Sequence, residues 1–78
     1  MVKLLFFAQI QEEIGEKEMD IEAAGKSVKE IKELYLSKYK IDYLLAEAMV
    51  AINEEYASDS SVAEDGDVIA FIPPVSGG

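Results

Sequence analysis

The residues of this 78-residue chain with the clearest chemical potential are the last two, Gly77 and Gly78. Because they lack side chains, they form a slim strip that can enter a narrow channel and approach another protein's backbone. The α-carboxylate of Gly78 is a poor electrophile because it is negatively charged. It becomes reactive once activated, for example as a mixed anhydride with AMP. A sulfur nucleophile can then displace AMP and leave a thiocarboxylate. We therefore interpret the α-carboxyl group of Gly78 as a site that other proteins modify.

The remaining composition offers little catalytic machinery. The chain has no histidine, no cysteine and no arginine. Without histidine and cysteine, a Ser/His or Cys/His nucleophilic pair, a disulfide and the usual zinc ligands are excluded. We therefore expect a non-catalytic subunit that binds no metal and no cofactor directly, and whose partners supply ATP and the catalytic groups.

The net charge of −9, from 16 acidic and 7 basic residues, restricts the partners. Nucleic acid and anionic membrane surfaces both require basic faces, so we expect neither. The charge has two open interpretations, which are solubility and steering toward a basic partner. No apolar stretch approaches the roughly 18 residues of a membrane span. The apolar start, residues 1–8, is too short for a signal peptide, and we expect a cytoplasmic protein.

Two prolines separate the glycines from the last apolar segment. Terminal glycines alone are a weak signal, because chain ends are often disordered. Here they come four residues after a strongly apolar strand, and proline fixes φ, ends a strand and favours an extended path. We therefore predict a domain of residues 1–72 followed by an extended, flexible tail, residues 73–78, made of Pro73, Pro74, Val75, Ser76, Gly77 and Gly78.

Hydrophobic periodicity predicts the elements that hold this tail. The expected strands are residues 2–8, 17–22, 49–53, a short edge strand around Tyr56, and 68–72. The expected helical segments are one turn at 10–14 closed by Gly15, a main helix from about 27 to 39, and a short piece at 42–47. This order places one main amphipathic helix against one sheet face. We predict an α+β fold, the ubiquitin-like β-grasp, in which a mixed sheet wraps around one main helix.

Finer expectations concern which side chains face the core. Ser27 and Glu30 have the spacing of a capping box at the start of the main helix. Its apolar stripe is expected to comprise Val28, Ile31, Leu34 and Tyr35, and the outward residues are expected to be Lys29, Lys32, Glu33 and Lys38. In the first strand Lys3 marks the outer face, and alternation places Leu5 and Phe7 on that same face.

The sequence contains four distinctive segments: residues 2–8 (VKLLFFA), 51–53 (AIN), 65–67 (DGD) and 71–78 (FIPPVSGG). In these segments the chain resembles the small, sulfur-carrier subunit of molybdopterin synthase, the MoaD family, which is ubiquitin-like. The resemblance covers the chain from end to end. Its most specific part is residues 65–78, above all the sequence PPVSGG.

The resemblance implies a reaction sequence for Gly78. An E1-like adenylyltransferase uses ATP to adenylate the matching glycine, so that AMP is present transiently, and sulfur from a donor protein converts it to a thiocarboxylate. The tail residues Pro74, Val75, Ser76 and Gly77 then enter the active site of the large subunit. There the sulfur passes to cyclic pyranopterin monophosphate during molybdenum cofactor biosynthesis. The implied complex is a heterotetramer of two large and two small subunits.

The resemblance also implies an apolar docking surface that includes Phe7, Ile72 and Pro73. For Phe7, ordinary core packing is the alternative. Relatives often have an aromatic residue at the position of Ile72. Many also have an arginine shortly after the first strand, where this chain has Gln9 and Gln11.

Three other functions share some of these features. A carrier for thiazole synthesis or transfer RNA thiolation would have the same fold and terminal glycines, although the Pro-Pro-Val-Ser lead-in is not expected there. A ubiquitin-like modifier would form isopeptide bonds with lysines of other proteins. A plain interaction domain would have inert glycines.

Overall fold

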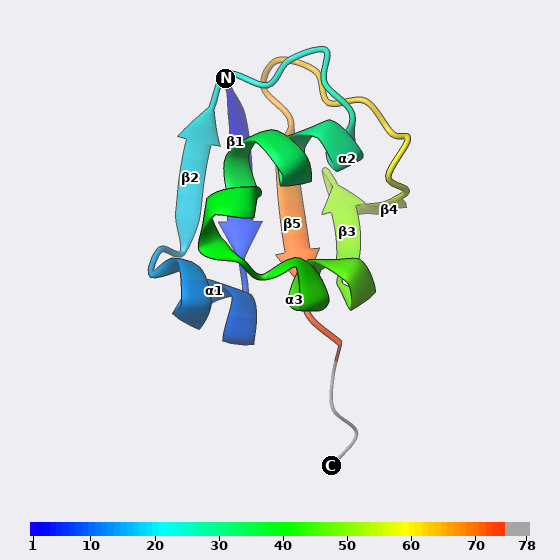
Figure 1. Ribbon diagram of the computed structural model, residues 1–78. Coiled ribbons are helices and arrows are strands. Elements are labelled where there is room, and N and C mark those ends of the chain that lie inside the picture. Colours follow the sequence, from blue (N-terminus) through cyan, green and yellow to red (C-terminus); the bar gives the residue numbers. More distant parts are fainter. Residues whose placement is uncertain (75–78) are drawn as a thin grey trace.

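Five strands form one mixed sheet in the order β2-β1-β5-β3-β4 (Figure 1). This computed structural model describes residues 1–74. Its strands are β1 (Val2–Phe6), β2 (Glu18–Ile21), β3 (Met49–Ile52), β4 (Glu55–Ala57) and β5 (Val68–Ile72). β1 and β5 pair in parallel at the centre, and the other neighbouring strands pair antiparallel. The predicted mixed sheet of an α+β, β-grasp fold is therefore confirmed.

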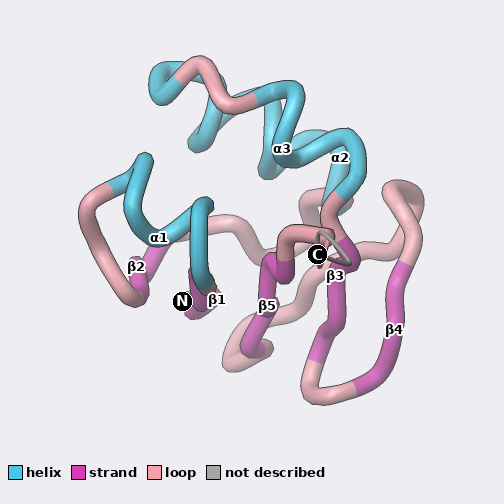
Figure 2. The backbone as a smooth tube through the Cα atoms, turned by 90° about the horizontal axis from the view of Figure 1, so that it is seen from below, coloured by secondary structure: helices cyan, strands magenta, loops and turns pink. Residues whose placement is uncertain are grey.

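The helical segments lie on one side of this sheet (Figure 2). They are α1 (Ala8–Ile14), α2 (Val28–Ile31), the π-helix η1 (Lys32–Leu36), the 3-10 helix η2 (Ser37–Tyr39) and α3 (Asp42–Glu47). Gly15 caps α1 in the left-handed conformation, with φ 84°, as its sequence position predicts. The first strand is shorter than predicted, because Phe7 is the N-cap of α1 and the backbone turns at Ala8, where φ is 49°.

The main helix starts as predicted but changes its pitch. The Ser27 Oγ accepts from the Glu30 N–H at 3.1 Å, and the Glu30 carboxylate accepts from the Ser27 N–H at 3.0 Å, so the capping box is present. Two expectations beyond it are wrong. Leu34 is 60% exposed and Leu36 is fully buried in its place. The Lys32 side chain is only 17% exposed, because its Nζ lies 2.9 Å from an Asp59 carboxylate oxygen. The π-helical stretch accounts for the exposure of Leu34 and the burial of Leu36, since i→i+5 hydrogen bonds end the 3.6-residue period on which the stripe was predicted. Lys32 stands four residues after Val28 and therefore lies on the same helix face as that buried residue.

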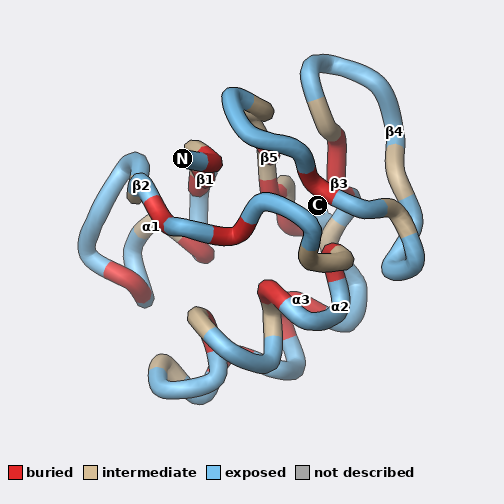
Figure 3. The backbone as a smooth tube through the Cα atoms, turned by 90° about the horizontal axis from the view of Figure 1, so that it is seen from above, coloured by how far each residue is buried: buried red, intermediate tan, exposed pale blue. Residues whose placement is uncertain are grey.

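The core lies between the helices and the inner face of the sheet, where the buried segments of Figure 3 gather. Alternation in β1 buries Val2, Leu4 and Phe6, and Phe6 stacks on Phe71 of β5 with ring centroids 6.0 Å apart. Helical side chains complete this core, among them Ile10, Ile31, Leu36 and Ile41. No helix or strand within residues 1–74 covers the opposite face of the sheet.

Two turns at the end of the sheet remote from the chain's exit are tied together by hydrogen bonds. The Asn53 amide donates to an Asp67 carboxylate oxygen at 2.9 Å and accepts from the Val68 N–H at 3.0 Å. The other Asp67 oxygen accepts from the Glu64 N–H at 2.9 Å. The Glu64 N–H and then the Asn53 amide lower the pKa of Asp67. These contacts give the sequence motifs at 51–53 and 65–67 a structural role.

Replacing Asp67 is expected to change how the melting temperature depends on pH, because its carboxylate holds this network together. A carboxylate whose folded pKa is depressed stabilises the fold above its unfolded pKa, and the stabilisation is lost as pH falls through the folded pKa. Asp67→Asn should therefore lower the melting temperature at neutral pH, and the difference from wild type should shrink as the solution is acidified below about pH 4. Thermal unfolding across pH tests this, with the exposed Glu16→Gln as control. A difference that is constant with pH would contradict the role of the charge.

Candidate functional site

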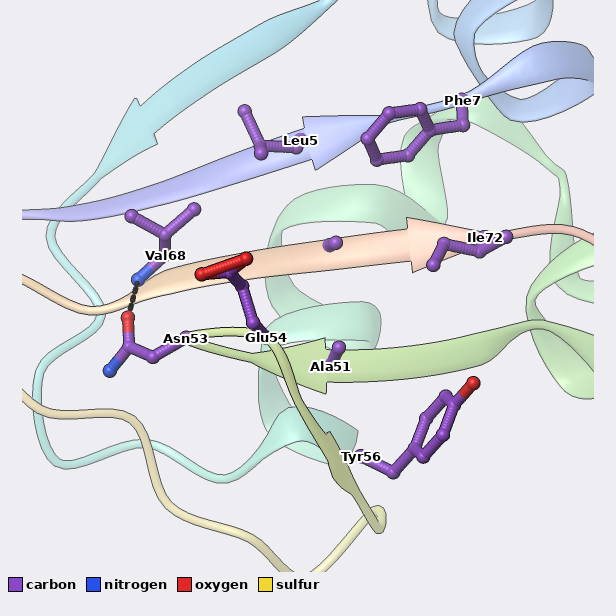
Figure 4. A pocket seen from close by; sticks show the side chains of 9 residues that line it. Leu5, Phe7, Ala51, Asn53, Glu54, Tyr56, Val68 and Ile72 are labelled. Atoms are coloured by element: carbon purple, nitrogen blue, oxygen red, sulfur yellow. Dashed lines mark hydrogen bonds between the residues drawn. The ribbon is translucent and has the colours of Figure 1, made fainter.

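The uncovered face of the sheet has an apolar hollow that spans four strands. In the register, Leu5 pairs with Ala70, Ala70 with Ala51, and Ala51 with Tyr56, so these side chains form one row across the sheet. Nine residues line the hollow, and we call this surface the open face: Leu5, Phe7, Ala51, Asn53, Glu54, Tyr56, Val68, Ala70 and Ile72. Figure 4 shows their side chains on the side of the sheet away from the helices.

The hollow follows from the sizes of these side chains. Ala51 and Ala70 pair in the register at the middle of the sheet, and because both are small they form the floor of the hollow. Larger side chains such as Phe7, Ile72 and Tyr56 stand around this floor (Figure 4). Phe7 is 43% exposed and Tyr56 is 78% exposed. Exposed aromatic side chains around an apolar patch are typical of a protein-binding surface. The open face can therefore bury a complementary apolar surface of another protein.

The sequence-predicted docking residues divide into two groups. Phe7 projects from the open face and does not belong to the buried core, and the half-buried Ile72 lines the same hollow. Pro73 is buried against the domain, and Pro74 is exposed. The remaining predicted tail residues, Val75, Ser76, Gly77 and Gly78, lie outside the described residues.

The chain leaves the sheet at one end of the open face. Because β1 and β5 are parallel, Phe7 and Ile72 both lie at this end of the strands. Met49, the first residue of β3, pairs with Ile72 there. Met49 is 47% exposed, and alternation places it on the same side as Ala51. Figure 1 shows the path continuing through Pro73 and Pro74 beyond this end of the sheet. A partner that covers the open face therefore lies beside the start of the tail.

Sequence reasoning missed several residues of this site. Alternation from Lys3 placed Leu5 outward, but Ala51, Ala70 and Tyr56 gave no such signal. β5 is apolar throughout, so its two faces look alike in the sequence, and only the pairing register separates them. The small size of Ala70 in an otherwise bulky strand is the one local signal that could have indicated an outward position.

Between residues 1 and 74, no polar or charged side chain is buried and no group of carboxylates is placed to hold a metal ion. No helix in that part of the chain has the length and apolar character needed to span a membrane.

Comparisons with known proteins agree with the fold and indicate a family. The chain matches the ThiS family over residues 4–78. It is 36% identical over 81 residues to the molybdopterin synthase sulfur carrier subunit of Haemophilus influenzae, and the match covers all of both chains. A chain in the complex of subunits 1 and 2 of the molybdopterin-converting factor from Helicobacter pylori aligns with a TM-score of 0.72 and 29% identity, covering 99% of this chain and 97% of that one. The small archaeal modifier protein 1 of Methanosarcina acetivorans shares the fold, with a TM-score of 0.82 at 24% identity, covering 99% and 95% of the two chains.

Proposed function

Because this chain belongs to the ThiS family and to the molybdopterin synthase sulfur-carrier subunits within it, we propose that it delivers sulfur to that synthase as a thiocarboxylate on Gly78. The observation that carries the proposal is the position of the open face. This apolar surface extends to the C-terminal end of β5, from which the chain continues toward Gly78. One docking event thus brings the tail and a partner's active site together.

The chemistry on Gly78 proceeds in balanced steps. Its carboxylate oxygen attacks the α-phosphorus of ATP on an E1-like adenylyltransferase, which releases pyrophosphate and forms an acyl adenylate. The terminal sulfur of a persulfide on a donor protein attacks the carbonyl carbon and AMP leaves, which gives an acyl disulfide. A thiol reductant then cleaves the sulfur–sulfur bond, which releases the donor and leaves the thiocarboxylate on Gly78. The thiocarboxylate sulfur forms a carbon–sulfur bond with cyclic pyranopterin monophosphate as a carbon–oxygen bond of that substrate breaks. Water then hydrolyses the acyl–sulfur bond of the resulting thioester, which leaves the sulfur on the pterin and restores the Gly78 carboxylate. Every catalytic group in this scheme belongs to a partner.

The domain contributes reach and orientation to this scheme. The open face docks on the large subunit through Phe7 and Ile72, and Pro73 holds the exit of the chain against the domain. Pro74, Val75, Ser76 and Gly77 then enter the active site of the large subunit, which the glycines pass because they are slim. The proposed assembly contains two large and two small subunits and works in the cytoplasm.

Reconstitution tests this function. The chain is combined with the large subunit and the adenylyltransferase encoded in the same genome, a sulfur donor, ATP and cyclic pyranopterin monophosphate. We expect formation of the pterin dithiolene that depends on every component, with the ATP-free mixture as control. A thiocarboxylate that only thiazole or transfer RNA thiolation enzymes consume would keep the carrier role and change the pathway. Adducts on lysines of other proteins, without thiocarboxylate, would contradict the carrier role.

A further inference from the structure

The tight turn between β3 and β4 has an unusual residue at its second position. Asn53 and Glu54 both have positive φ, 51° and 69°, which matches the two-residue type I′ turn of a hairpin. Asparagine adopts this conformation readily, but the second position favours glycine because other side chains are strained there. Glu54 therefore keeps a side chain at a position where glycine would relieve strain. Strain of this kind is a reason to ask what the side chain does.

Glu54 lines the open face at the end remote from the tail. β3 runs from Met49, at the end of the sheet where the chain leaves β5, toward the turn. The turn therefore lies at the far end of the hollow, near Val68. Figure 4 shows the Glu54 carboxylate directed over the sheet on the open side. Among residues 1–74, no cation lies within ion-pair distance of this carboxylate and no donor hydrogen-bonds to it. The turn thus presents an uncompensated negative charge at the rim of an apolar surface.

Strand β2 adds two more acidic side chains to this side of the sheet, which also carries Lys3. β2 flanks the open face, and its Glu18 and Asp20 pair with Leu5 and Lys3 in the register, so they point outward with them. Lys3 lies 3.6 Å from the Glu18 carboxylate, which partly neutralises it. Five of the seven lysines lie within residues 26–40, in the segment that forms the helical layer, and only two of the sixteen acidic residues do.

This distribution selects among possible occupants of the open face. A second copy of the chain would bring another net charge of −9 to the surface, which disfavours self-association. A partner with a wholly apolar surface would bury the Glu54 carboxylate without compensation, which is costly. A partner with an apolar centre and a cation opposite Glu54 satisfies both the hollow and the charge.

We propose that Glu54 determines partner specificity by pairing with a lysine or arginine at the rim of the partner's apolar docking surface. The proposal rests on the proposed function, because it takes the large synthase subunit as that partner. The αL turn fixes the backbone of Glu54, and so the point from which its side chain starts, relative to the floor formed by Ala51 and Ala70. An unpaired or acidic group at the matching position of a wrong partner is rejected, so the residue discriminates as well as attracts.

Binding of the full chain to the large subunit from the same genome, at low and high ionic strength, tests this proposal. Glu54→Gln removes the charge at nearly constant size, and we expect about tenfold weaker binding at low ionic strength and a smaller loss at high ionic strength. Glu55→Gln is the matched control. It is the neighbouring residue with the same charge, but its pairing with Ile52 places it on the other side of the sheet. Its affinity should stay within about twofold of wild type.

A second variant separates the contact from the fold. Glu54→Gly relieves the positive φ, so its melting temperature should rise while its affinity falls as in Glu54→Gln. Equal binding of wild type and Glu54→Gln at low ionic strength would overturn the proposal, as would an equal loss in Glu55→Gln. Self-association of the free chain that Glu54→Gln strengthens would assign the face to a second copy instead. If wild type itself fails to bind the large subunit, the proposed function fails, whereas loss of the Glu54 effect alone leaves that function standing.

Discussion

Deletion of Gly78 is expected to lower sulfur transfer to the pterin precursor by at least about a hundredfold. The shortened chain still ends in a carboxylate, but the reactive carbon is withdrawn by one residue, roughly 3.5 Å of extended chain. Displacements of about 1 Å at a reacting centre can already cost about a hundredfold in rate. Single-turnover conversion of cyclic pyranopterin monophosphate by the reconstituted system measures the effect.

Two controls belong to the deletion. The melting temperature should stay near the wild-type value, because the core and the strand pairs that the structure describes are formed without Gly78. Affinity for the large subunit should also change little, because the open face is intact. A large fall in melting temperature, or sulfur transfer at the wild-type rate, would show that Gly78 is not the reactive end.

Phe7→Asp is expected to weaken binding to the large subunit by about a hundredfold. The substitution removes an exposed aromatic side chain beside the tail exit and places a charge where a partner must exclude water. The fold should tolerate it, because Phe7 is 43% exposed and occupies the N-cap of α1, a position that aspartate favours. Calorimetric titration of the large subunit measures the loss, and thermal unfolding checks the fold.

Tyr43→Asp is the matched control for Phe7→Asp. Tyr43 is an aromatic residue of α3 with 64% exposure, and it lies in the helical layer away from the open face. Its substitution should leave affinity unchanged. Equal losses in the two variants would mean that net charge, rather than the open face, governs docking. Wild-type affinity in Phe7→Asp would remove Phe7 from the docking surface.

The two perturbations address separate steps. The Gly78 deletion is predicted to dock without transferring sulfur, whereas Phe7→Asp is predicted to hold a competent tail that seldom reaches the active site. At high concentrations of the large subunit, Phe7→Asp should therefore recover transfer and the deletion should not.

Much of the fold was predictable because local patterns determine it. The last strand, Val68–Ile72, and the short helix, Asp42–Glu47, have the predicted bounds. The strand is an apolar run between Gly66 on one side and Pro73 on the other, so its bounds can be read from the sequence itself. The capping box of Ser27 and Glu30 was likewise readable, because both partners lie within one helical turn.

The features that the sequence did not reveal depend on contacts between distant residues. Lys32 pairs with Asp59, 27 positions away, and Leu34 is exposed within the π-helical segment that begins at Lys32. Ala51 and Ala70 form the floor of the hollow only because β3 and β5 pair in one particular register. Glu54 belongs to the open face because Asn53 and Glu54 both have positive φ. A glutamate in the sequence does not indicate such a conformation, which glycine favours.

The mass of the intact protein from its native host tests the central claim most directly. With sulfur supply and the adenylyltransferase intact, we predict a fraction that is heavier by the difference between one sulfur and one oxygen atom. Fragmentation should place this difference on Gly78. Protein that is entirely unmodified under these conditions, or a sulfur atom at another position, would contradict the account.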